Sequence, residues 1–516
     1  MDLLNNLALG FSTVLSLDPV SFPLVGTIPF PTNIVLCFIG CLVGTLIGVL
    51  PGVGPIATIA ILLPITFNVD PVGALIMLAG IYYGAQYGGS TTAILVNMPG
   101  ETSSVVTCLD GYKMALKGQA GAALSIAALG SFFAGCVSTV FVAAFSPPLS
   151  ALALKFGPAE YFSLMTLGLI GAVVLAHGSL LKAITMIILG LLLGIVGTDV
   201  NSGVARFDFG IPELSDGIGI VSVAMGLFGF AEIVTNLEST EVRELVARKV
   251  KGLLPTWAQF KLAAPAVLRG TGLGSILGIL PGGGAMLASF AAYAVEKKLS
   301  KHPEEFGQGA IQGVAGPESA NNAGAQTSFI PLLTLGIPEN AVMAMMVGAM
   351  TIHNIQPGPQ VITSNPQLFW GLIASMWVGN AMLVVLNLPL IGIWIRLLTV
   401  PYRLLYPAIL LFCAIGVYTV NNTSFDVMQT AAFGFLGVLF VKLEMEPAPL
   451  LLGFVLGPMM EENLRRALLL SRGDPFVLLT RPISAGLLIA AALLIVIIAL
   501  PNIRSKREEA FQEEPT

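Results

Sequence analysis

The stretch GTLIGVLPGVG at residues 44–54 recurs 230 residues later as GSILGILPGGG at residues 274–284. Both copies lie in strongly apolar sequence, and each ends in a proline followed by glycines. Because proline lacks an amide hydrogen and glycine weakens a helix, each copy is predicted to interrupt a helix near its middle. The repeat therefore predicts two matched helix breaks in an apolar chain.

The composition places these breaks in a membrane. The 516-residue chain is 55% hydrophobic and only 10% charged, with a mean hydropathy of +0.87. Soluble domains contain roughly 25% charged residues, so this chain lacks the polar surface that water requires on all sides. Residues 161–181, 340–395 and 482–500 contain no Asp, Glu, Lys or Arg, and a spanning helix needs about 20 apolar residues. We predict an all-α polytopic membrane protein with about ten to fourteen spanning or re-entrant segments. The backbone groups freed at each break cannot face lipid, so each break must lie against protein or a water-filled cavity.

The basic residues indicate which loops face the cytoplasm. None precedes Lys113, and clusters follow in residues 236–261 and 296–305. The positive-inside bias assigns both of these loops to the cytoplasm. The apolar stretch 262–296 then begins and ends on one side of the membrane, as a re-entrant hairpin or a broken helix pair with Pro281 at its apex. Two basic clusters, at 465–472 and 504–507, flank the single span 482–500, so the side of the C-terminus stays open.

The simplest organisation is one transmembrane domain built from two homologous repeats, at about 33–235 and about 262–503. A charged linker (236–261), predicted to be largely helical, joins them, and a polar tail (504–516) follows. A weaker echo supports the duplication, because residues 88–102 and 325–340 share a polar turn, a short apolar run and a proline close to a glutamate. This second offset is about 239 rather than 230. Inverted repeats are the commoner arrangement in such chains, and a parallel arrangement remains open.

Each break is expected to form a site for a small anion. A helix that restarts after the Pro-Gly turn directs its first amide groups into the gap, where unsatisfied donors and the helix dipole favour negative charge. The residues concerned are Pro51, Gly52, Val53 and Gly54 in the first copy and Pro281, Gly282, Gly283 and Gly284 in the second. Paired breaks at corresponding places in two halves are typical of a transporter's substrate site. The alternative is that the glycines only allow close helix packing.

Uncharged polar residues accompany both breaks. The first half contributes Ser90, Thr91 and Thr92, and the second contributes Asn321, Asn322, Gln326, Thr327 and Ser328. These side chains are candidates for contacts with substrate carboxylates. The run 316–324 is too polar to face lipid, and unwound carbonyls near Asn321 and Asn322 are a possible Na⁺ site. The alternative for this run is an ordinary surface loop.

Three glutamates near the breaks are candidates for coupling transport to H⁺ or Na⁺: Glu101, Glu318 and Glu339. An ionisable residue at membrane depth is by default a functional candidate. A glutamate at a helix start can equally serve only to complement the helix dipole. His353 titrates near neutral pH in principle, although lone histidines are more often structural. Asp110 and Lys113 are spaced to pair with each other on a helix.

Signatures of enzymes are absent from the sequence. It contains no His-Glu-x-x-His, no Gly-x-Ser-x-Gly and no phosphate-binding loop ending in Gly-Lys-Ser/Thr. We therefore expect neither an enzyme nor an ATPase. We expect no cofactor apart from a coupling ion, and no nucleic-acid partner.

The chain closely resembles the large membrane subunit of the bacterial tripartite tricarboxylate transporters. The resemblance rests on residues 44–54, 274–284 and 316–339, on HNIQPGP at 353–359 and on LSRGD at 470–474, and it covers essentially the whole chain. It implies a multi-pass secondary transporter of the bacterial inner membrane that takes up citrate-like carboxylates with Na⁺ or H⁺. It also implies two protein partners, a small membrane subunit and a periplasmic solute-binding protein that delivers the substrate.

Two functional hypotheses follow. The first is an ion-coupled carboxylate symporter whose substrate lies between the two broken hairpins. The second is an anion channel whose filter is built from the same Pro-Gly loops. An intramembrane enzyme would need a nucleophile–base pair or a metal cluster, and the sequence indicates neither.

Overall fold

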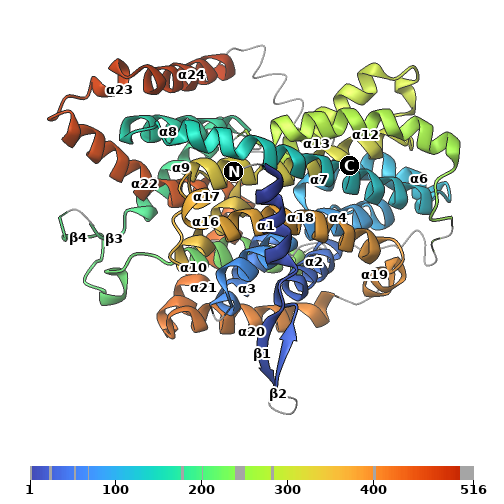
Figure 1. The fold of residues 1–516 in the computed structure, drawn as a ribbon, viewed down its shortest axis with the longest axis horizontal. Helices are drawn as coiled ribbons and strands as arrows, with labels where there is room; N and C mark the ends of the chain where they lie inside the picture. The colour runs from blue at the N-terminus through green and yellow to red at the C-terminus, as the bar shows by residue number, and fades with distance from the viewer. Residues whose placement is uncertain are drawn as a thin grey trace.

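The computed structural model describes residues 3–22, 26–50, 54–67, 69–175, 179–199, 202–238, 250, 252–280, 284–398 and 402–499. It is predominantly helical, which confirms the predicted helical class (Figure 1). Two small antiparallel hairpins depart from a purely helical fold: β1 (Asp18–Phe22) pairs with β2 (Gly26–Phe30), and β3 (Gly197–Thr198) pairs with β4 (Ala205–Arg206). Both hairpins project from the helical body, on different sides of it (Figure 1).

The helices of the first half are α1 (Leu3–Val14), α2 (Thr32–Val49), α3 (Pro55–Thr66), α4 (Pro71–Val96), α5 (Val105–Thr107), α6 (Lys113–Leu116), α7 (Ala120–Ala153), α8 (Pro158–Leu175), α9 (Leu180–Gly194), α10 (Ile220–Ala224) and α11 (Ala231–Glu238). Short 3-10 or π segments lie at Thr102–Ser104, Cys108–Tyr112, Pro212–Leu214, Met225–Phe230 and Pro303–Glu305. The second half contains α12 (Trp257–Leu277), α13 (Gly284–Leu299), α14 (Gln312–Thr327), α15 (Phe329–Leu335), α16 (Ala341–Ile352), α17 (Val361–Ser364), α18 (Pro366–Asn387), α19 (Ile391–Leu397), α20 (Tyr402–Asn421), α21 (Ser424–Lys442), α22 (Ala448–Leu470), α23 (Val477–Thr480) and α24 (Pro482–Ala499).

In the described part of the chain, four helices are long and apolar enough to cross a membrane: α2, α7, α18 and α21. Seven further apolar helices of 10–17 residues accompany them. Together they make eleven apolar segments, within the range of about ten to fourteen spanning or re-entrant segments expected from the sequence. Among them α1, α3 and α16 have 12 residues each, which is too short to span a bilayer alone.

Helix α2 packs against α4 through glycines spaced four residues apart. A Cβ atom added to any of them would overlap a backbone carbonyl of α4: Gly40 lies against Met77, Gly44 against Ile81 and Gly48 against Ala85. Small residues in this pattern let two helix backbones approach closely. The packing alternative weighed for the repeated glycines is therefore correct for Gly44 and Gly48.

Helices α12 and α14 pack in the same way in the second half. Gly270 lies against the carbonyl of Gly316, Gly274 against that of Ala320 and Gly278 against that of Gly324. Each of these α12 glycines follows its α2 counterpart by 230 residues, and each α14 partner follows its α4 counterpart by 239. The offset of 230 thus relates α2 to α12, and the offset of 239 relates α4 to α14. The packing of α2 on α4 has the same residue register as the packing of α12 on α14.

The offset of 239 continues into the turns that follow α4 and α15. The residue after α4, Asn97, has φ 60°, and the residue after α15, Gly336, has φ 72°; both are left-handed. The next helical segment follows Glu101 (φ −154°, ψ 166°) in the first half and Asn340 (φ −141°, ψ 177°) in the second. The weaker sequence similarity between residues 88–102 and 325–340 therefore corresponds to similar backbone conformations in the two turns.

Helices α4 and α14 run antiparallel. Ser90 of α4 contacts Glu318 of α14, with 2.5 Å between Ser90 Oγ and Glu318 Oε2. Earlier along α4, the ring of Tyr82 lies 6.5 Å from that of Phe329, which follows α14. The residue number therefore rises along one helix as it falls along the other.

The two halves are interleaved elsewhere as well. α8 packs on α24, where Ser163 Oγ lies 2.7 Å from Ser484 Oγ. α9 packs on α22, where Gly190 lies against the carbonyl of Leu450. Long-range contacts between the halves thus join them into one helical body.

One expectation about local structure needs correction. Asp110 does not pair with Lys113, because its Oδ1 instead accepts hydrogen bonds of 2.7–2.9 Å from the amides of Gly307, Gly309 and Ala310. These backbone donors lie far away in sequence, so helical spacing could not indicate them. The expected repeat boundary at about 262 lies within α12, and the division into repeats stays a prediction. Within the linker, residues 239–249 and 251 lie outside the described residues.

Candidate functional site

Both predicted helix breaks are present. α2 ends at Val49 and α3 begins at Pro55, with Gly54 as its N-cap residue. α12 ends at Leu277 and α13 begins at Gly284. Six of the residues predicted to bind an anion lie outside the described residues: Pro51, Gly52, Val53, Pro281, Gly282 and Gly283. Of the eight residues predicted at the breaks, only Gly54 and Gly284 can be placed.

The polar run 316–324 is neither an unwound segment nor a surface loop. It belongs to α14, which continues from Gln312 through Pro317 to Thr327 and is buried from Gly313 onward. The carbonyls near Asn321 are therefore not unwound, and a Na⁺ site near Asn321 and Asn322 stays a prediction. The run is polar because its side chains meet other polar groups inside the protein, and buried polar groups need such partners.

Glu318 lies at the centre of a buried polar cluster. Its Oε2 accepts a 2.5 Å hydrogen bond from Ser90 Oγ and a 3.4 Å bond from Asn321 Nδ2, and its Oε1 accepts a bond from Thr107 Oγ1. In the part of the chain that the structure describes, no lysine or arginine forms an ion pair with this carboxylate. A buried carboxylate without a counter-charge is costly unless a proton or a cation accompanies it. The chemistry of this cluster thus suits a proton or a small cation.

Asn322 extends the cluster to α7. Its Nδ2 donates to Ser131 Oγ at 2.8 Å and to the Glu318 carbonyl at 3.0 Å, whereas its Oδ1 has no hydrogen-bond partner among the described residues. A cavity of about 10 Å³ lies beside the cluster, with Ser90, Thr91 and Ser131 in its lining. This is about the space that one water molecule needs. The structure thus brings Ser90, Thr91, Asn321 and Asn322 to one place.

The remaining polar candidates serve two different roles. Thr92 donates to the Gly48 carbonyl at 3.2 Å, Thr327 to the Ala323 carbonyl at 3.1 Å and Ser328 to the Ala325 carbonyl at 2.8 Å. These hydroxyls are satisfied by nearby helix backbone. Gln326 is fully buried, and neither atom of its amide has a hydrogen-bond partner among the described residues. A buried amide in this state carries a cost that a polar guest would remove.

Glu101 acts as a cap in the first half. It precedes the 3-10 segment Thr102–Ser104 and forms a capping box with Ser104. Its carboxylate also accepts a hydrogen bond from Ser103 Oγ, which lies 2.6 Å from Gln86 Oε1. Glu101 thus lies at a helix start, and its role in ion coupling stays a prediction.

Glu339 lies at the second break. It is 1% exposed, and its Oε2 accepts a 2.7 Å hydrogen bond from Asn340 Nδ2. A Cβ atom on Gly284 would overlap Glu339 Oε1, so this carboxylate lies at the first residue of α13. The residue 239 positions before Glu339 is Gly100, which has no side chain. The two breaks therefore differ, because the chain's own carboxylate lies where the second break was expected to bind a substrate anion.

Sequence reasoning missed two residues of the Glu318 cluster, Thr107 and Ser131, and also Ser103, which bonds to Glu101. Ser103 and Thr107 closely follow Glu101, but no periodic pattern singles them out. Ser131 belongs to a run of small residues spaced for close helix contact, which includes Gly135 and Ser138. Small residues at this spacing indicate a packed helix face, and that signal could have found Ser131.

The metal search and the larger cavity concern other parts of the described chain. No group of three or more His, Cys, Asp or Glu side chains that could hold a metal ion occurs among the described residues. A cavity of about 290 Å³ lies elsewhere, with part of the HNIQPGP motif in its lining. Its lining residues include Phe156, Tyr161, Gln356, Gln360, Glu462 and Arg466. His353 follows the end of α16.

Comparison with known proteins assigns the family. The model of the tripartite tricarboxylate transporter TctA family matches residues 34–452. An Agrobacterium vitis protein, named as an uncharacterized 52.8 kDa protein in the TAR-I ttuC' 3' region, is 60% identical over 514 residues, covering 100% of both chains. A second A. vitis protein, named as an uncharacterized protein in the TAR-II ttuC' 3' region, is 62% identical over 241 residues, 47% of this chain and 100% of its own length. No solved structure matches the chain. The chain belongs to the tripartite tricarboxylate transporter TctA family, as its sequence motifs predicted.

Proposed function

We propose that this protein is the membrane subunit of a secondary transporter that takes up citrate-like carboxylates, driven by Na⁺ or H⁺. The family supports the transport of tricarboxylates, and the buried Glu318 cluster supports ion coupling. The observation that carries the coupling is the hydrogen bond from Ser90 to Glu318. It joins the two halves of the chain through a carboxylate that lacks a basic partner among the described residues. A proton or cation bound at Glu318 would therefore change a contact between the two halves.

The repeats are proposed to be inverted. α4 and α14 are related by the 239-residue offset, and they run antiparallel. Equivalent helices that run in opposite directions are expected when a pseudo-two-fold axis lies in the membrane plane. The matching glycine contacts of α2 with α4 and of α12 with α14 support the same arrangement.

The substrate is proposed to bind near the two breaks, with the amides at Gly54 and Gly284 and the Gln326 side chain as donors. Gln326 supports this placement because its buried amide is unpaired among the described residues. At the second break the substrate would meet Glu339. A negatively charged guest and a charged Glu339 repel each other, so binding there requires Glu339 to be protonated, paired with a cation or moved.

The remaining components are proposed from the family. A tripartite system implies a small membrane subunit and a periplasmic solute-binding protein, with this chain in the bacterial inner membrane. The basic loop at 236–261 is placed in the cytoplasm.

The decisive test is uptake into proteoliposomes that contain both membrane subunits, with the solute-binding protein added outside. Radiolabelled citrate is supplied under a Na⁺ gradient alone, a pH gradient alone or neither. Saturable uptake that requires a gradient and the binding protein is expected. Gradient-independent anion currents, with no requirement for the binding protein, would instead favour the channel hypothesis.

A further inference from the structure

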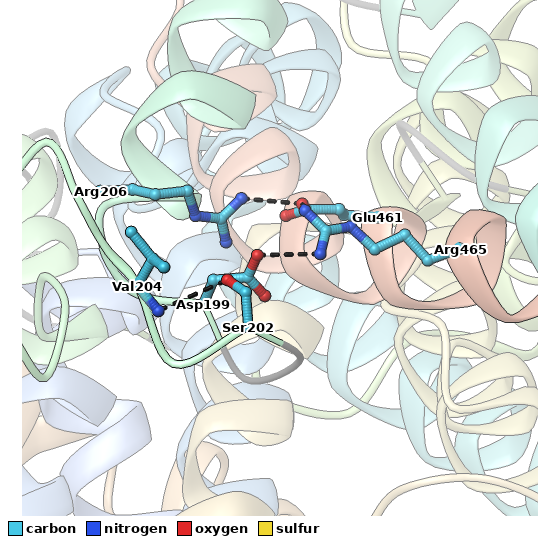
Figure 2. A network of polar contacts seen from close by, with 6 residues as sticks. All are labelled: Asp199, Ser202, Val204, Arg206, Glu461 and Arg465. Carbon is cyan, nitrogen blue, oxygen red and sulfur yellow. Dashed lines mark hydrogen bonds and ion pairs between the residues drawn. The ribbon is translucent and has the colours of Figure 1, made fainter.

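A loop between α9 and α10 is fastened to α22 by a network of charges. Arg206 on β4 pairs with Glu461 at 2.7 Å, and Asp199 next to β3 pairs with Arg465 at 2.8 Å. Arg465 also pairs with Glu461 at 2.6 Å, which closes the network (Figure 2). Networks of several charges hold geometry better than isolated surface pairs do. The base of this loop is therefore fixed relative to α22.

The loop carries an exposed apolar tip. Phe209 is 80% exposed, Val204 60%, Phe207 52% and Ile211 37%. Phe207 and Phe209 have φ values of 53° and 50°, in the left-handed region that bulky residues avoid. Such strain persists only where the surrounding structure imposes it, and it clusters at functional positions. Two aromatic rings held outward on a fixed base are typical of the centre of a protein interface.

Acidic residues lie close to this tip in the sequence. Asp208 is between the two phenylalanines and is half-buried, and the exposed residues Glu213 and Asp216 follow. Among the described residues none of these three forms an ion pair. An anionic lipid surface would repel this cluster of charge. A protein partner with an apolar cleft rimmed by lysine or arginine complements it.

The positive-inside bias places the loop on the periplasmic side. The helical run from α10 to α11 covers residues 220–238, about 28 Å at 1.5 Å per residue, close to the thickness of a bilayer core. It separates the loop from the basic residues Arg243, Arg248 and Lys249, which the bias assigns to the cytoplasm. The basic cluster near 465 would then also be periplasmic. That cluster would depart from the bias, and its Arg465 and Arg466 both form ion pairs with acidic neighbours.

The cavity of about 290 Å³ lies on the same segment of α22. Glu462 and Arg466 line it, next in sequence to Glu461 and Arg465, which hold the loop. Cavities of roughly 300 Å³ and above accommodate small organic ligands. A partner seated on the loop would thus stand beside a space that can receive a small molecule.

We propose that Val204, Phe207, Phe209 and Ile211 form the docking surface for the soluble, substrate-carrying partner of this transporter. The inference rests on the proposed function, because it takes from it the existence of a periplasmic delivery protein. It adds the position of the contact and its chemistry: two aromatic anchors within an acidic rim, beside the cavity on α22. The partner surface is expected to be apolar at its centre and basic around it.

The first test varies the concentration of the solute-binding protein in the proteoliposome assay. Phe209→Ser is expected to raise its half-saturating concentration at least about tenfold, with the maximal rate unchanged, because buried aromatic anchors dominate interface energies. The matched control is Leu254→Ser, which removes a side chain that is 85% exposed in the linker assigned to the cytoplasm. An unchanged half-saturating concentration for Phe209→Ser, or a loss of maximal rate alone, would overturn the docking surface.

A double variant tests the acidic rim. Glu213→Lys with Asp216→Lys is expected to slow association and to weaken its dependence on ionic strength, since charges at the rim steer encounter. Association that is as fast and as salt-dependent as in the native protein would contradict the proposed role of the rim.

A third experiment does not depend on transport. A photo-reactive benzophenone residue replaces Phe209 in the assembled complex, which is irradiated in the presence of the solute-binding protein. A crosslink to that protein supports the proposal, and crosslinks to lipid or to the small membrane subunit overturn it. If the native complex shows no uptake under any gradient, the proposed function fails. If native uptake requires the binding protein but the variants behave as native, only the docking surface fails.

Discussion

Ser90 Oγ and Glu318 Oε2 lie 2.5 Å apart, although 228 residues separate them in sequence. This hydrogen bond joins α4 of the first half to α14 of the second, in the interior of the protein. Thr107 and Asn321 also donate to the carboxylate, so three side-chain donors converge on one titratable group. A change in the charge of Glu318 would therefore alter the contact between the halves.

Glu318→Gln is expected to uncouple transport from its driving ion. The amide keeps the size of the side chain but cannot take up a proton or neutralise a cation. Uptake under an imposed gradient should fall by on the order of tenfold or more, in line with typical coupling free energies. The measurement is citrate uptake in proteoliposomes, with Glu304→Gln as a matched control at an exposed position. Full gradient-driven uptake by Glu318→Gln would show that coupling lies elsewhere.

Because Glu339 lies against Gly284, substitutions of these two residues are predicted to have non-additive effects on stability. Gly284→Ala places a methyl group on Glu339 and is expected to abolish uptake while the protein still inserts. Glu339→Ala in the same chain removes the overlap, so the double variant should recover the thermal stability that Gly284→Ala loses. The coupling between the two sites is measured as the departure of the double variant from additivity. Additive losses of stability would mean that the two groups do not touch.

Two glycines of α12 allow a controlled test of the helix contact. Gly274→Ala drives a Cβ atom into the carbonyl of Ala320, and it should destabilise the protein by about 1–3 kcal/mol as an overpacked contact. Gly272→Ala lies on the same helix with no atom within 4 Å, and it should be neutral or stabilising by up to about 1 kcal/mol. Thermal unfolding in detergent, followed by tryptophan fluorescence, checks both. Equal effects of the two variants would refute the packing role of Gly274.

Asp110 is predicted to stabilise the loop before α14. Asp110→Ala leaves the half-buried amides of Gly307 and Gly309 and the buried amide of Ala310 without their acceptor, and an unsatisfied buried donor costs about 1–3 kcal/mol. A lower unfolding temperature and faster proteolysis near residue 307 are expected. Glu305→Ala, at an exposed neighbouring position, serves as the control. An unfolding temperature equal to that of the control would show that the amides find other acceptors.

The sequence predicted the breaks, the offsets and the family because each is a local or repeated pattern. The end of α2 and the start of α3 follow from the chemistry of Pro51 and Gly54, and the 230-residue offset reappears in the contacts of Gly44 and Gly274. The position of Glu339 against Gly284 was beyond sequence reasoning, because it depends on how the turn after α15 packs on α13. The helical state of the run 316–324 was missed for a similar reason. Polar residues there resemble a loop until their partners on α4 and α7 are known.

The close contact of the α2 glycines with carbonyl groups of α4 also limits how these helices can move. Carbonyl oxygens of Met77, Ile81 and Ala85 fill the spaces left by three glycines, so sliding by part of a turn would force them against larger neighbours. The same holds for α12 on α14. Each of these two helix pairs should therefore move as a rigid unit. Any change of shape that exposes the substrate to the opposite compartment then has to come from rotation of one pair relative to the other.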